Sequence, residues 1–171
     1  MKKILLVFLF LSLQVAACKK DSSKNTLPPI TQDGKNTFGC YVDGQLWLPA
    51  NSYSITARVL CITLDQGNSF TLLVQHDHSG NDLKDRFSLA FKPLTSTGTY
   101  DLTDQSKAGA ELIQSESDLS NTYTIVKGQL TITRFDNIVA GQFYLSIKNN
   151  NTGKIYNITD GRFDLESDFC H

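Results

Sequence analysis

Two short stretches alternate large apolar side chains with smaller or polar ones, and this alternation constrains the fold more than any other feature. Each stretch carries a row of three large apolar residues: Phe87, Leu89 and Phe91 in the first, Phe143, Leu145 and Ile147 in the second. Successive side chains of a strand point to opposite faces, so each row predicts a strand with one face in a core. A shift of one residue in the pairing of either strand would turn its whole apolar row toward water, so we expect a fixed register.

Turn-forming residues between further apolar stretches extend this pattern along the chain. The Asp43-Gly44 pair separates residues 37–42 from residues 45–48 and predicts a β-hairpin. Further strands are expected in residues 52–65, 70–74, 85–92, 129–135, 138–148 and 154–165. Apolar residues do not recur at a regular spacing in residues 103–120, so we expect a short strand mixed with loop there. About eight to ten short strands predict an all-β protein, an antiparallel β-sandwich, with a closed β-barrel as the alternative.

The N-terminus has the architecture of an export signal. Two lysines follow Met1, and residues 4–13 are apolar except for Ser12. This run is too short for a conventional transmembrane helix, which needs roughly 20 apolar residues. We therefore expect residues 1–17 to be a signal peptide that is removed on export.

Residues 15–18, Val-Ala-Ala-Cys, resemble a bacterial lipobox. The resemblance implies cleavage before Cys18, transfer of a diacylglycerol to its thiol and acylation of its new amine, for example with palmitate. Several acyl chains make membrane anchoring stable, whereas one chain is marginal. Lys19-Lys20-Asp21 loosely resembles the tract that sends Bacteroidetes lipoproteins to the cell surface. We expect a protein anchored in the outer membrane, on its periplasmic or cell-surface face; the alternative is an ordinary secretory signal with Cys18 incidental.

A polar segment separates Cys18 from the predicted strands. Residues 18–36 contain Pro28-Pro29 and Gly34 and predict a lipidated N-terminus with a flexible tether of about 25 Å. A single β-domain, residues 37–171, follows and is expected to be monomeric. The chain after residue 17 has 14 Lys and Arg against 17 Asp and Glu, a side-chain charge of −3. This charge argues against nucleic acid as a partner.

Three tracts of the predicted domain resemble a known family. They cover residues 37–49, 132–143 and 158–164, the last reading Ile-Thr-Asp-Gly-Arg-Phe-Asp. They are similar to a family of uncharacterised Bacteroidetes lipoproteins built on a single domain of unknown function. The resemblance implies a lipid-anchored, mostly antiparallel β-domain and supplies no catalytic residues.

The remaining cysteines suggest a disulfide bond. Cys40, Cys61 and Cys170 are left when Cys18 carries lipid, an odd number in an oxidising compartment. A bridge between Cys40 and Cys170 would close a loop of about 130 residues and stabilise the fold by up to roughly 4.7 kcal/mol. Cys61 would then be a buried free thiol; the alternative is that all three are free.

One cluster has the side chains of a metal site. His76 and His78 would share a strand face and, with Asp82 as a third ligand, could bind zinc or copper in a small metal-assisted hydrolase. The favoured interpretation of His76–Asp82 is a solvated hairpin loop. The chain has no Gly-x-Ser-x-Gly or His-Glu-x-x-His motif. We therefore expect no cofactor and favour, over an enzyme, a binding or accessory module whose partner is a glycan or an envelope protein.

Aromatic side chains offer a further candidate surface. A glycan could stack on a platform formed by Trp47 and several tyrosines: Tyr41, Tyr53, Tyr100, Tyr123, Tyr144 and Tyr156. The favoured interpretation is that aromatic residues in strands pack in or against the core.

Overall fold

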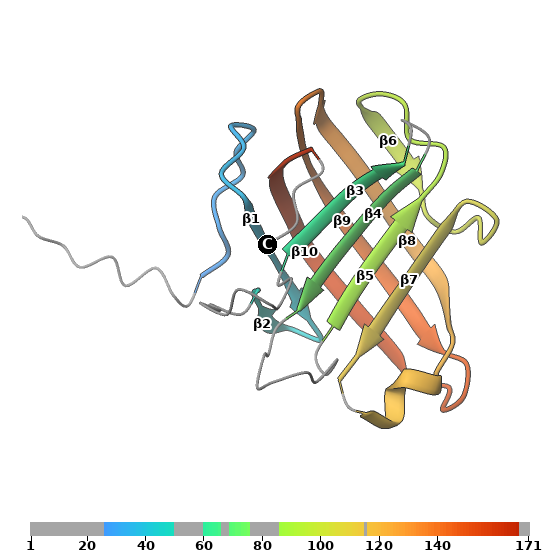
Figure 1. Ribbon diagram of the computed structural model, residues 1–171. Helices are drawn as coiled ribbons and strands as arrows, with labels where there is room; N and C mark the ends of the chain where they lie inside the picture. Colours follow the sequence, from blue (N-terminus) through green and yellow to red (C-terminus); the bar gives the residue numbers. More distant parts are fainter. Residues whose placement is uncertain (1–25, 50–59, 66–68, 76–85, 115, 168–171) are drawn as a thin grey trace, which may run out of the picture.

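The computed structural model describes residues 26–49, 60–65, 69–75, 86–114 and 116–167, and of residues 60–65, 116 and 117 it describes the backbone alone. These residues form ten strands and one short 3-10 helix. The strands make two antiparallel sheets that face each other (Figure 1), and no hydrogen-bonded strand pair in the described ranges joins one sheet to the other. The predicted β-sandwich is confirmed, and the barrel alternative does not apply to this part of the chain.

Sheet A has six strands, in the order β2 (Gln45–Trp47), β1 (Thr37–Val42), β10 (Ile155–Glu166), β9 (Ile138–Asn149), β8 (Tyr123–Phe135) and β6 (Gly98–Asp101). The predicted hairpin is confirmed. Its strands β1 and β2 pair across Asp43 and Gly44, whose φ angles of 48° and 79° suit a type I′ turn. The first strand also pairs with the last, so that Thr37 lies opposite Asp164.

Sheet B has four strands, in the order β3 (Leu60–Asp65), β4 (Ser69–Gln75), β5 (Arg86–Phe91) and β7 (Ala108–Ile113). The segment without a clear period, residues 103–120, supplies β7 and the 3-10 helix η2 (Glu116–Ser120). Strand β8 begins at Tyr123, earlier than the predicted start at residue 129. A β-bulge between Ile125 and Lys127 shifts the alternation of side chains there, which explains why periodicity missed this end of the strand.

The two apolar rows predicted from the sequence meet between the sheets. Phe87 of β5 and Phe143 of β9 stack with ring centroids 5.6 Å apart and planes 5° from parallel. Phe38 of β1 lies 6.1 Å from Phe87 and 6.0 Å from Phe143, centroid to centroid. All six members of the rows are buried. The predicted registers are therefore confirmed, and this aromatic cluster joins the two sheets.

A glycine makes room for the ring of Phe143. Gly161 of β10 lies beside the ring of Phe143 on the neighbouring strand, where a Cβ atom would be 2.5 Å from the ring. The ring therefore packs directly on backbone, a close approach that requires glycine.

Candidate functional site

Most site residues predicted from the sequence lie outside the described part of the chain. They are Cys18, His76, His78, Asp82 and Cys170. In the described residues, no group of three or more His, Cys, Asp or Glu side chains is placed to hold a metal ion. The zinc or copper site therefore stays a prediction. Across the same ranges, the structure has no helix with the length and apolar character needed to cross a bilayer.

Cys40, the predicted partner of Cys170, is a free thiol in the structure. It lies in β1 with none of its surface exposed, and burial raises the pKa of the thiol to about 12. The pairing stays a prediction, because Cys170 is not among the described residues. A bridge would require the C-terminus to reach into the core beside Cys40.

Most described residues of the candidate aromatic platform pack in or against the core and are not available to a ligand. Trp47 and Tyr156 are buried in the core, and Tyr100 and Tyr123 pack against it. Tyr144 of β9 remains exposed, at 41%, on the outer face of sheet A, with the Lys127 ammonium 5.8 Å from its ring centroid. The described aromatic residues thus mainly stabilise the sandwich.

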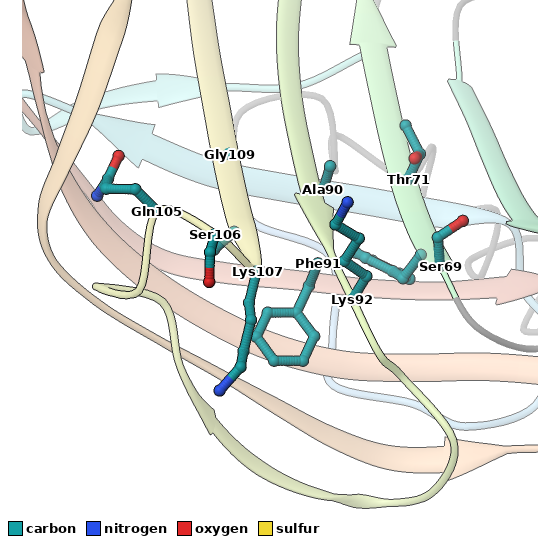
Figure 2. A pocket seen from close by; sticks show the side chains of 11 residues that line it. Ser69, Thr71, Ala90, Phe91, Lys92, Gln105, Ser106, Lys107 and Gly109 are labelled. Atoms are coloured by element: carbon teal, nitrogen blue, oxygen red, sulfur yellow. The ribbon is translucent and has the colours of Figure 1, made fainter.

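The outer face of sheet B has a depression at one end of its strands (Figure 2). A row of small residues crosses three strands there, because Ala90 of β5 lies opposite both Thr71 of β4 and Gly109 of β7. A Cβ atom at Gly109 would meet nothing within 4 Å, so the row leaves open space above the sheet. The resulting cavity has a volume of about 310 Å³. Sequence reasoning missed it because its residues come together only through strand order.

Two lysines lie at this depression. The backbone amide of Lys92 donates to the carbonyl of Lys107, which holds the end of β5 beside the start of β7. The Lys107 ammonium is 3.1 Å from a carboxylate oxygen of Asp104. Hydrogen bonds from Ser106 and then Lys107 lower the pKa of Asp104 to about 2. The depression is thus lined by two lysines, of which Lys107 is ion-paired with Asp104, and by residues that carry hydroxyl groups, such as Ser69.

A second polar centre surrounds Asp164 of β10, whose side chain is only 1% exposed. Its carboxylate accepts four hydrogen bonds from a segment before β1: from the Thr31 hydroxyl at 2.6 Å and from the backbone amides of Gly34, Asp33 and Lys35 at 2.8, 3.0 and 3.3 Å. Burial alone would raise the pKa of this carboxyl, but the hydrogen bonds outweigh it and hold the pKa below the ordinary value. Asp164 is therefore ionised at neutral pH.

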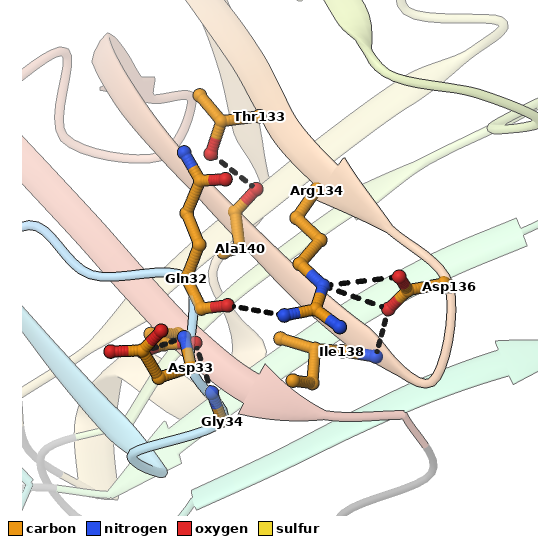
Figure 3. A network of polar contacts seen from close by, with 9 residues as sticks. Gln32, Asp33, Gly34, Thr133, Arg134, Asp136, Ile138 and Ala140 are labelled. Carbon is orange, nitrogen blue, oxygen red and sulfur yellow. Dashed lines mark hydrogen bonds and ion pairs between the residues drawn. The ribbon is translucent and has the colours of Figure 1, made fainter.

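Residues 27–36 follow the surface of sheet A, and we call them the strap. Figure 3 shows the Arg134 guanidinium donating to the Gln32 carbonyl, at 2.6 Å, while it also binds Asp136. Arg162 donates to the carbonyl of Pro28 at 3.2 Å. At Gly39 of β1, a Cβ atom would lie 2.7 Å from Pro28, so the strap packs closely on the strand.

The sequence predicts a flexible tether over residues 18–36, and the structure places residues 27–36 of this segment on the folded body. No local signal revealed this, because the partner carboxylate of Asp164 lies about 130 residues further along the chain.

The described geometry can be compared with known proteins. Residues 37–164 match the family described as a domain of unknown function, DUF6252. The chain belongs to this family. The DUF6252 match begins with β1 and ends at Asp164, so it includes the carboxylate and leaves out the strap. The predicted single domain of unknown function is confirmed, whereas lipoprotein character and Bacteroidetes origin stay expectations. No curated protein and no solved structure matches the chain.

Proposed function

We propose that this DUF6252 protein is a lipid-anchored binding module of the bacterial outer membrane, and that the depression on sheet B binds an acidic glycan. The anchoring is supported by the export signal and by the lipobox-like residues that end at Cys18. The family resemblance described from the sequence points to the same location.

The observation that carries the binding proposal is the depression itself. Its volume of about 310 Å³ falls in the range of small-ligand sites, roughly 300–1,000 Å³. A stable protein partner would instead bury about 800 Å² of surface on each side. The depression is small in comparison, so its size favours a glycan over an envelope protein. Lys92 and Lys107 favour a glycan with carboxylate, sulfate or phosphate groups, because ammonium groups bind anions through charge-assisted hydrogen bonds.

An array of acidic and neutral oligosaccharides tests this assignment. We expect the wild-type protein to retain acidic members, and a Lys92→Ala, Lys107→Ala double variant to bind them at least about tenfold more weakly, since tenfold corresponds to 1.4 kcal/mol. Lys148→Ala is the matched control, because Lys148 is an exposed lysine of β9 in the other sheet. Equal binding of neutral members, or an unchanged double variant, would overturn the assignment.

The anchor has its own test. We expect Cys18→Ser to move the protein from the detergent phase to the aqueous phase in phase partitioning. The far-ultraviolet circular dichroism should stay that of a β-protein, because residue 18 precedes the folded body. A variant that remained in the detergent phase with its fold intact would refute lipid attachment at Cys18.

A further inference from the structure

We infer that the strap is a latch that holds the sandwich close to the membrane, with the outer face of sheet A toward the bilayer and the depression of sheet B away from it. The inference rests on the lipid anchor proposed above. It assigns a membrane-facing and a partner-facing surface to the domain.

The strap and the depression lie on opposite outer faces of the sandwich. Asp164, which binds the strap, stands between Phe163 and Leu165, and these two neighbours point into the core. Asp164 therefore points away from the core, on the outer side of sheet A. In the same way, Thr71 of the depression stands between Phe70 and Leu72, two core residues of sheet B.

The outer face of sheet A also makes an apolar contact with the strap. Ile138 of β9 is buried, yet it does not belong to the core cluster between the sheets. It is in contact with the strap, because a Cβ atom at Gly34 would lie 3.3 Å from two of its side-chain atoms. The strap thus combines an apolar contact with the hydrogen bonds to Asp164.

The strap shortens the distance over which the lipid can hold the domain. Leu27, the first residue of the strap, follows Cys18 by nine residues, a length of chain that spans at most about 32 Å at full extension. Without the strap, the first residue held by the sandwich would be Thr37, and the same geometry would allow about 68 Å. Latching therefore keeps the face that carries the strap near the bilayer.

The latch itself is tested by amide hydrogen exchange on the Cys18→Ser chain. The carboxylate uses both oxygens, one for the Gly34 amide and the other for Thr31, Asp33 and Lys35. Asp164→Asn keeps the shape but replaces one of these oxygens by an amide donor. We expect the strap amides at positions 33–35 to exchange at least about tenfold faster in this variant.

Asp160→Asn is the matched control, because it removes a carboxylate from an exposed position of the same strand. Asparagine also tolerates the positive φ of 52° at that position. We expect wild-type exchange of the strap amides in the control. Unprotected strap amides in the wild type, or equal exchange in both variants, would overturn the latch.

The orientation is tested on the full-length protein in vesicles of phosphatidylethanolamine and phosphatidylglycerol. A donor dye is attached at Gln129→Cys on sheet A or at Thr71→Cys on sheet B, two exposed outward positions, with Cys61 and Cys170 changed to serine. We expect stronger energy transfer to a headgroup acceptor from position 129 than from position 71. In Asp164→Asn the difference should shrink, because the domain is held less closely.

The outcomes separate the latch from the anchor. A protein that fails to float with the vesicles refutes the anchor, and the exchange experiment still tests the latch. A protein that floats but shows equal transfer from both positions refutes the orientation and leaves the anchor standing.

Discussion

Replacing Gly161 by alanine tests how closely the core is packed around Phe143. The added Cβ would lie 2.5–2.6 Å from three atoms of the Phe143 ring, where ordinary contacts begin at 3.4 Å. The ring must therefore retreat by about 1 Å into space that a well-packed interior does not have. The ring is also confined by Phe87, with which it stacks.

Overpacking of this kind costs typically about 1–3 kcal/mol of the free energy of unfolding. The backbone adds no strain of its own, because Gly161 does not adopt a positive φ. Urea unfolding followed by fluorescence of the buried Trp47 measures the loss. Phe143→Leu should relieve the clash, so the double variant should be more stable than the sum of the two single effects predicts, by about 1 kcal/mol or more.

Gly109→Ala is the control for this experiment. Gly109 is an exposed glycine of β7 with nothing within 4 Å of an added Cβ, and it too lacks a positive φ. We expect its substitution to change stability by no more than about 0.5 kcal/mol. Equal losses at both glycines, or additive effects at Gly161 and Phe143, would refute the packing argument.

Three further predictions concern a core leucine, a buried thiol and the histidine pair. Leu89→Ala should cost about 2–5 kcal/mol and Ser88→Ala no more than about 0.5 kcal/mol, because only Leu89 is fully buried; equal losses in urea unfolding would contradict the inward face of β5. Cys40 should resist alkylation until the protein is unfolded, because its thiol is buried and its pKa is about 12; rapid native labelling, followed by mass spectrometry, would show otherwise. Changing His76 and His78 to alanine should alter stability by no more than about 0.5 kcal/mol each and remove no bound metal; stoichiometric zinc or copper in the wild type that the double variant loses would promote the hydrolase alternative.

The parts of the fold that could be predicted are those fixed by local patterns. The row that contains Leu89 and the Asp43-Gly44 turn each carry their signal within a few consecutive residues, and both are confirmed. Strand β6 was missed because it is a four-residue edge strand whose residues are exposed or half-buried, so it has no apolar face to reveal it.

The candidate site was harder to predict because it depends on strand order. Thr71, Ala90 and Gly109 are ordinary outward-facing residues in the sequence, and only the order of β4, β5 and β7 makes them neighbours. Asp164 likewise becomes a strap ligand only when the last strand lies beside the first. Single-sequence periodicity carries no information on either arrangement.

The pairing of the first strand with the last also determines the order in which the chain can fold. Sheet B is made from strands that follow one another closely, whereas β1 must wait for β10 before its main partner exists. Contacts so distant along the chain form slowly, because they close a long loop. In an exported chain that emerges N-terminus first, the strap stays undocked until the C-terminal strand has followed. Under the anchoring proposed above, Cys18 would receive its lipid on a segment that is not yet held to the sandwich, and docking of the strap would then draw the domain toward the bilayer.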